Sequence, residues 1–161
     1  MSFATAYVGL GSNLERPREQ VLGAFDELAS LPETRLVRRS ALYRSAPVGH
    51  EAQPDFVNAV ARLETGLAPP RLLEALQRIE LRHGRERPFP GAPRTLDLDL
   101  LLYDDAVIAS PALTLPHPRM HQRAFVLRPL AEIAPEARVP GRGTAEQLLR
   151  ACEAQDVEPM A

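Results

Sequence analysis

Residues 94–103 read Arg-Thr-Leu-Asp-Leu-Asp-Leu-Leu-Leu-Tyr, a stretch that predicts a buried β-strand carrying two carboxylates. Side chains alternate between the two faces of a strand, so Asp97 and Asp99 lie on one face, about 7 Å apart, and the leucines between and beside them lie on the other. Two divalent ions about 3.5–4 Å apart can share such carboxylates and bind a transferring phosphoryl group from both sides. The expected metal is Mg²⁺, which favours carboxylate, phosphate and water ligands.

Arginines crowd the segment that leads into this strand. Guanidinium groups bind phosphate through two parallel hydrogen bonds, so a cationic cluster beside a carboxylate pair suits a nucleotide polyphosphate with its metals. Two other interpretations stay open: one Asp could cap the strand while the other pairs with an arginine, and the arginines could form a solvated face, because the chain has no lysine and all 19 basic residues are Arg. The clustered residues are Arg78, Arg82, Arg85, Arg87 and Arg94.

Length and composition predict one globular domain over residues 1–161. A hydrophobic fraction of 45 %, a charged fraction of 25 % and a net charge of -2 give no global attraction to nucleic acid or membranes, so any anion site must be local. Cys152 is the single cysteine, which excludes an intramolecular disulfide. The chain shows neither a leader pattern nor an apolar run of about 18 residues, and we expect a cytoplasmic protein.

The predicted elements follow the order strand, helix, strand, strand, helix, strand. This order is typical of an α+β fold with a ferredoxin-like split βαβ core, in which helices pack on the faces of an antiparallel sheet. Asp104-Asp105 is expected to turn the chain into a hairpin strand over residues 107–109, and residues 155–161 look like a loose tail. The expected strands are residues 3–10, 34–43, 56–63 and 94–103, and the expected helices are residues 16–30, 69–84, 123–133 and 144–154.

Three further features bear on the site. Glu80 falls on the apolar stripe of the second helix, where a carboxylate needs a partner, either an arginine or a bound substrate. His117, between Pro116 and Pro118, is either structural or a hydrogen-bond donor to a phosphate. The run Gly-Leu-Gly-Ser-Asn at residues 9–13 lacks the third glycine of a dinucleotide motif, and without lysine there is no phosphate-binding P-loop, so metals and arginines must hold any phosphates.

Together these segments resemble the 6-hydroxymethyl-7,8-dihydropterin pyrophosphokinase family. The string Pro-Arg-Thr-Leu-Asp-Leu-Asp at residues 93–99, with Gln-Arg-Ile-Glu upstream at residues 77–80, is the most specific part. Order and spacing hold over residues 5–135. The other matching segments are residues 8–14, 43–45, 53–58, 84–85, 116–117 and 123–125.

The resemblance implies an enzyme that transfers the β,γ-diphosphate of ATP to the hydroxyl of 6-hydroxymethyl-7,8-dihydropterin and releases AMP, in tetrahydrofolate biosynthesis. It implies two Mg²⁺ ions held by Asp97 and Asp99 and ATP as co-substrate. We expect small-molecule partners only, with no nucleic acid or membrane, and a monomer, because nothing in the sequence demands an oligomer. Catalytic roles fall to Asp97, Asp99, Arg85 and Arg94, with Asp97 also orienting the attacking hydroxyl. The implied ATP-binding residues are Gln77, Glu80, Arg85, Arg94, Leu100, His117 and Arg123. The implied pterin-binding residues are Gly11, Asn13, Ser45, Ala46, Val48, Phe56, Asn58 and Phe125.

These assignments are chemically reasonable, since an Asn side chain offers a donor and an acceptor to the pterin amide edge and an aromatic ring can stack on the pterin. The chain also departs from the family. It has no tryptophan, its loop before the Asp motif contains residues 88–91 as Pro-Phe-Pro-Gly, Phe56 and Pro118 stand where relatives often have tyrosine, and Ala112 stands where some have arginine. These changes bear on single ATP contacts and spare the metal carboxylates.

Two rival functions remain to be weighed. A different metal-dependent nucleotidyl or phosphoryl transferase would share the fold, since fold alone does not specify function, but it would release pyrophosphate or ADP instead of AMP. An RNA-binding module of ferredoxin-like fold would need exposed aromatics on its central strands and a basic face. The aromatic fraction of 5 % and the net charge of -2 argue against the RNA-binding module.

Overall fold

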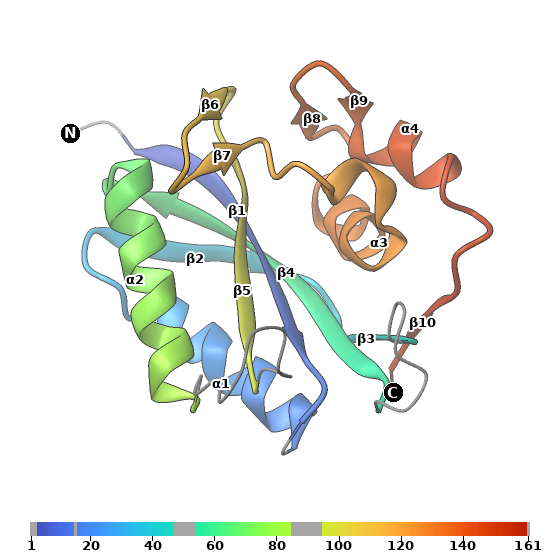
Figure 1. The fold of residues 1–161 in the computed structure, drawn as a ribbon, viewed down its shortest axis with the longest axis horizontal. Coiled ribbons are helices and arrows are strands. Elements are labelled where there is room, and N and C mark those ends of the chain that lie inside the picture. The colour runs from blue at the N-terminus through green and yellow to red at the C-terminus, as the bar shows by residue number, and fades with distance from the viewer. Residues whose placement is uncertain (1–2, 15, 47–53, 85–94, 161) are drawn as a thin grey trace.

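The computed structural model describes residues 3–14, 16–46, 54–84 and 95–160 (Figure 1). Its elements in chain order are β1 (Ala4–Ser12), α1 (Pro17–Ala29), β2 (Thr34–Arg39), β3 (Tyr43–Ser45), β4 (Phe56–Thr65), α2 (Pro69–Arg82), β5 (Asp97–Tyr103), β6 (Ile108–Ala109), β7 (Thr114–Leu115), the 3₁₀ helix η1 (Met120–Gln122), α3 (Ala124–Ile133), β8 (Arg138–Val139), β9 (Gly143–Thr144), α4 (Ala145–Arg150) and β10 (Val157–Pro159). Within the described residues, no helix is long and apolar enough to cross a membrane.

The main sheet confirms the predicted topology. Strand β1 lies between β5 and β4, and β2 pairs with the far half of β4, all antiparallel. The spatial order β5-β1-β4-β2, with helices α1 and α2 in the connections β1–β2 and β4–β5, is that of a split βαβ. Strand β3 pairs with the other half of β4, and β10 extends the sheet beyond β3.

Helices cover both faces of the sheet, as predicted (Figure 1). Helices α1 and α2 pack on one face, where their apolar residues at helical spacing join Val8 and Leu10 of β1 and Leu98 and Leu100 of β5 in one core cluster. Helix α3 packs on the opposite face over Tyr7, Val60 and Leu101. Because both faces are covered, the central strands are apolar on both sides and bury nearly every residue.

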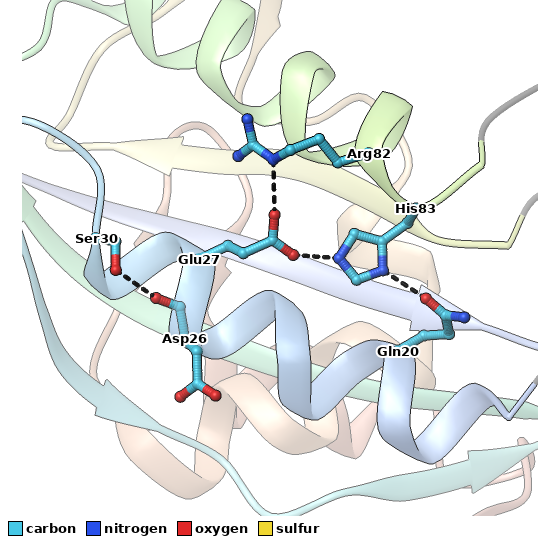
Figure 2. Close-up of polar contacts among 6 residues, drawn as sticks. All are labelled: Gln20, Asp26, Glu27, Ser30, Arg82 and His83. Carbon is cyan, nitrogen blue, oxygen red and sulfur yellow. Dashed lines mark hydrogen bonds and ion pairs between the residues drawn. The ribbon is translucent and has the colours of Figure 1, made fainter.

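A polar cluster ties the C-terminal end of α2 to α1 (Figure 2). Glu27 of α1 accepts a hydrogen bond from Nε of Arg82 at 3.0 Å and also pairs with Nε2 of His83, while Nδ1 of His83 contacts Gln20. The backbone N–H of His83 donates to the carbonyls of Ile79 and Glu80, so this residue also closes α2. The cluster therefore fixes the two helices at one end of their shared layer.

Two local predictions are wrong. The predicted strand 34–43 is divided into β2 and β3, because Ser40 leaves the regular ladder and its hydroxyl accepts a bond from the Val60 N–H at 2.9 Å. Residues 107–109 do not fold back onto β5; β6 pairs with β7 instead. At the end of β5, Asp104 exchanges bonds with Thr5 of β1, accepting from its N–H at 2.8 Å and donating to its carbonyl at 2.8 Å.

The prediction of a loose C-terminal tail is also wrong for the described residues. Strand β10 pairs with β3, Val157 is buried, and the N–H of Met160 donates to the carbonyl of Leu42 at 2.9 Å. The guanidinium of Arg128 on α3 donates to the Val157 carbonyl at 2.8 Å. The edge of β3 offers unpaired backbone groups, and the C-terminal residues satisfy them. The three residues of β10 are too few to show the alternating pattern from which a strand is predicted.

Candidate active site

A cavity of about 780 Å³ opens on the α3 side of the sheet, between β5, β1, β4, the start of α3 and the segment before β10. It brings together nine of the residues that the sequence singled out: Gly11, Ser45, Ala46, Phe56, Asn58, Asp97, Asp99, Arg123 and Phe125. A smaller hollow of about 520 Å³ between α1 and α2 contains none of these nine but is lined by Arg78 and Arg82, so these two members of the predicted arginine cluster lie away from the carboxylates. The two predicted metal carboxylates, six of the predicted pterin residues and one predicted ATP residue, Arg123, therefore line one cavity.

The two carboxylates face this cavity across two glycines. In the register of β1 and β5, Gly11 lies opposite Asp97 and Gly9 lies opposite Asp99. Both aspartates are half-buried and line the cavity, whereas the leucines that alternate with them are buried against α2. A side chain at Gly11 would enter the space next to Asn58, whose Oδ1 lies 3.5 Å from the position of an added Cβ. The absence of a side chain at Gly11 leaves room for a ligand beside the carboxylates, whereas the Leu101 side chain lies 3.4 Å from the position of an added Cβ at Gly9.

Glu80 is buried, with 3 % of its surface exposed, and fastens α2 to the strand of the carboxylates. Its Oε2 accepts a hydrogen bond at 2.9 Å from the backbone N–H of Leu98, the residue between Asp97 and Asp99. The sequence predicted that the partner of Glu80 is either an arginine or a bound substrate. In the structure, the backbone N–H of Leu98 is a partner that the sequence did not predict. Glu80 does not line the cavity, so the structure gives it a role in positioning β5.

We predict that Glu80→Ala lowers the free energy of unfolding by about 2 kcal/mol, because it leaves the buried Leu98 N–H without this charged acceptor. The measurement is urea unfolding of the variant and of Glu80→Gln. The Gln side chain keeps an acceptor oxygen and should lose less stability than Ala. Equal stability of Glu80→Ala and the unsubstituted chain would contradict this role.

His117 lies beside β5 in a fixed orientation. Its backbone N–H donates to the Leu101 carbonyl at 3.0 Å, and its Nδ1 accepts a bond from the Arg119 N–H at 3.2 Å. The neutral ring therefore carries its proton on Nε2. Burial lowers the pKa of His117 from its ordinary value of 6.5. The negative charge of Asp99 raises this pKa, and the positive charges of Arg123 and Arg119 lower it further. His117 is thus suited to act near neutral pH as an uncharged donor close to Asp99 and Arg123.

We predict that His117 makes the folded chain less stable as the pH falls below about 6.5, the ordinary pKa of histidine. Its pKa is lower in the folded chain, so the unfolded chain binds more protons in this window, and the free energy of unfolding must rise with pH there. Urea unfolding at pH 5.5 and 7.5 tests this against His117→Asn, which does not titrate. Between pH 7.5 and pH 5.5, the free energy of unfolding of the variant should fall less than that of the unsubstituted chain. An unchanged pH dependence would contradict the assignment.

Asn58 is held by its neighbour on β3. Its Nδ2 donates to the Ser45 hydroxyl at 2.7 Å, and the residue is buried with 4 % of its surface exposed. This bond uses one of the two N–H groups of the amide and directs Oδ1 toward Gly11. Phe56, two residues earlier on β4, and Ala46, next to Ser45, complete this end of the cavity.

Arg123 and Phe125 form the opposite wall. Arg123 stands between η1 and α3, and its guanidinium carbon lies 5.4 Å from the centre of the Phe125 ring. A cation and an aromatic ring therefore meet on the α3 side of the cavity. Four other polar residues line the cavity and were not predicted from the sequence. Two belong to the polar, arginine-containing stretch after His117, and two to the segment expected to form a loose tail. These residues are Arg119, Gln122, Gln155 and Asp156.

The remaining predicted residues lie elsewhere. Gln77 is exposed on α2, and the side chain of Leu100 is buried in the core under β5. Asn13 is buried, with its Nδ2 donating to the Pro54 carbonyl at 3.3 Å, and does not line the cavity. Three predicted residues, and the loop 88–91, lie outside the described residues: Arg85, Arg94 and Val48.

Comparison with known proteins identifies the family. Residues 7–135 match the family model described as 7,8-dihydro-6-hydroxymethylpterin-pyrophosphokinase (HPPK). The 2-amino-4-hydroxy-6-hydroxymethyldihydropteridine pyrophosphokinase of Pseudomonas aeruginosa is 53 % identical over 152 residues, covering 94 % of each chain. The protein of the same name from Haemophilus influenzae is 47 % identical over 146 residues, covering 91 % of each chain.

A solved structure supports the fold. The crystal structure of Plasmodium falciparum HPPK-DHPS wild type with pteroate superposes with a TM-score of 0.73 at 15 % identity, covering 93 % of this chain and 42 % of that one. This chain therefore spans less than half of that protein, and the likeness concerns the fold alone. The family match and the two bacterial relatives cover most of the chain. The chain belongs to the 7,8-dihydro-6-hydroxymethylpterin-pyrophosphokinase family.

Proposed function

We propose that this chain transfers the β,γ-diphosphate of ATP to the hydroxyl of 6-hydroxymethyl-7,8-dihydropterin with the help of Mg²⁺, in the cavity beside Asp97 and Asp99. Family membership makes the chain a pyrophosphokinase of folate biosynthesis. The observation that carries the proposal is the pair of carboxylates on one face of β5, which line the cavity beside Gly11 of β1, where the absence of a side chain leaves space for the reactants.

The donor set suits Mg²⁺. In the described part of the chain, no group of three or more His, Cys, Asp or Glu side chains converges on one position, so protein ligands there are limited to the two aspartates. Mg²⁺ is commonly bound through one or two carboxylates together with substrate phosphates and water. Bound there, Mg²⁺ would neutralise charge on the phosphate oxygens of ATP. We propose two such ions held by Asp97 and Asp99.

The chain's own groups would do the positioning. We assign the triphosphate to Arg123 and to the Nε2 proton of His117, with Arg85 and Arg94 in the same role and Gln77, Glu80 and Leu100 toward the nucleoside. Oriented donors of this kind stabilise charge on a transferring phosphoryl group without covalent chemistry.

The pterin would lie in the same cavity, between Asn58 and Phe125. We assign its amide edge to Asn58 and its ring face to Phe125, because the first offers donor and acceptor and the second a flat apolar surface. The remaining residues proposed for this pocket are Gly11, Asn13, Ser45, Ala46, Val48 and Phe56. The hydroxymethyl oxygen would then bond to the β-phosphorus while the bond from that phosphorus to the α,β-bridging oxygen breaks. The hydroxyl proton passes to solvent, and AMP leaves with the bridging oxygen. Asp97 would orient the hydroxyl.

A product assay tests this function. The chain is incubated with ATP, Mg²⁺ and 6-hydroxymethyl-7,8-dihydropterin, and the products AMP, ADP and pyrophosphate are resolved. AMP release that depends on both the pterin and Mg²⁺ is expected. Release of ADP or pyrophosphate in place of AMP would assign the cavity to a different phosphoryl or nucleotidyl transfer.

We further propose that residues 1–161 act as a single domain, as a monomer, in the cytoplasm. Six of the strands form one sheet, and α1, α2 and α3 pack on its two faces, which supports the single domain. Gel filtration with light scattering gives the oligomeric state directly, and a molar mass near twice 17.7 kDa would contradict the monomer.

A further inference from the structure

Gln155, from the segment before β10, holds the backbone on both sides of Arg123. Its Oε1 accepts a hydrogen bond from the Ala124 N–H at 3.0 Å, and its Nε2 donates to the Gln122 carbonyl at 2.8 Å. Exchanging the two amide atoms would set oxygen against oxygen and N–H against N–H, so these two bonds fix a single orientation of the amide. One side chain thus binds the two peptide groups that flank Arg123.

The backbone at Arg123 needs such support. Arg123 joins η1 to α3 with an extended conformation, φ −118° and ψ 105°, between two helical segments. It precedes α3 without giving that helix a side-chain cap, and the first N–H groups of a helix have no partner within the helix. Gln155 supplies that partner for Ala124 from 31 residues further along the chain.

Gln155 is itself held in place. Its backbone N–H donates to the Cys152 carbonyl at 3.0 Å, and β10 follows two residues later, paired with β3. Arg128 of α3 also binds the carbonyl of Val157. The segment is thus attached to both the sheet and α3, and Gln155 and Asp156 line the same cavity as the carboxylate pair.

We propose that Gln155 is a positioning residue for the transfer: it sets the place of Arg123, and with it Phe125, relative to Asp97 and Asp99. The proposal rests on the proposed function, in which Arg123 binds the triphosphate and Phe125 the pterin. The 5.4 Å stacking distance between the Arg123 guanidinium and the Phe125 ring couples the two side chains, so a shift of this backbone displaces both.

The test compares Gln155→Met, which keeps the length of the side chain and removes both bonds, with Gln155→Glu, which keeps the acceptor for the Ala124 N–H. Loss of two hydrogen bonds should lower kcat/KM about 10-fold in the Met variant. The Glu variant should have a kcat/KM between those of the Met variant and the unsubstituted chain. The melting temperature should fall by no more than about 4 °C, because Gln155 is exposed. Glu158→Gln, an exposed change in β10 that does not line the cavity, serves as the matched control and should keep full activity.

A double variant separates positioning from a general loss of structure. If Gln155 acts through Arg123, then adding Gln155→Met to Arg123→Ala should cost little beyond Arg123→Ala alone. Full additivity, or unchanged kcat/KM in Gln155→Met, would overturn the proposal. Hydrogen exchange at the Ala124 amide should accelerate in Gln155→Met, and unchanged exchange would equally overturn it. If the unsubstituted chain releases no AMP, the proposed function fails, and the exchange measurement still decides whether Gln155 fixes this backbone.

Discussion

Asp97→Ala should lower pterin-dependent AMP release by about 10²–10³-fold or more, the loss typical for one preorganised charge-stabilising group. Asp97 lines the cavity from β5 opposite Gly11, and its carboxylate is one of two proposed to hold Mg²⁺. Because the side chain is half-buried and the apolar side of β5 is untouched, the variant should fold. The measurement is the rate of AMP release at saturating ATP, Mg²⁺ and pterin.

The matched control is Asp105→Ala, which removes a carboxylate from the exposed turn after the same strand. It should keep the rate of the unsubstituted chain, since it lies outside the cavity. Raising the Mg²⁺ concentration should recover part of the activity of Asp97→Ala if the lost group is a metal ligand. Full activity of Asp97→Ala would exclude this carboxylate from the reaction.

Asn58→Leu should lower kcat/KM for the pterin by about 10²-fold, equivalent to two hydrogen bonds of about 1.4 kcal/mol each, with little change in KM for ATP. Leu has a similar volume, so the change removes the donor and the acceptor and leaves the packing of β4 nearly intact. The Ser45 hydroxyl would lose the hydrogen bond that Nδ2 of Asn58 donates to it. Steady-state kinetics with each substrate varied in turn measures the effect.

Ser45→Ala separates the two roles of Asn58. It removes the bond that orients the amide and keeps the amide itself, so the loss in kcat/KM should be smaller than that of Asn58→Leu. An equal rise in KM for ATP and for the pterin in Asn58→Leu would contradict a pterin-specific role. In that case the residue would act by supporting the whole cavity.

The element order and the carboxylate pair were predictable because they rest on local patterns. Period-two alternation in residues 94–103 and helical spacing in α1 and α2 determine which faces are apolar, and the structure buries those faces. The split βαβ arrangement then follows from the order of the elements. The glycines opposite Asp97 and Asp99 were visible in the sequence, but their place depends on the register between β1 and β5.

Other parts depend on contacts between residues far apart in the chain. The partner of Glu80 is a backbone N–H on a strand 18 residues later, and every residue has such a group, so no residue type points to it. Strand β6 likewise pairs with β7 and not with β5, and two-residue strands are too short for their sequence to predict the partner. The same holds for the break of strand 34–43 at Ser40.

The sequence alone determined the fold class, the family and the carboxylate pair on one face of β5, because residue type and periodicity are properties of a single segment. Only the tertiary structure decided that residues 155–157 line the cavity, that Gln155 holds Arg123, and that His117 lies half-buried near Asp99 with a lowered pKa. These features arise from hydrogen bonds and burial between segments that meet only when the sheet closes around them, and such long-range pairing leaves no periodic trace in either segment.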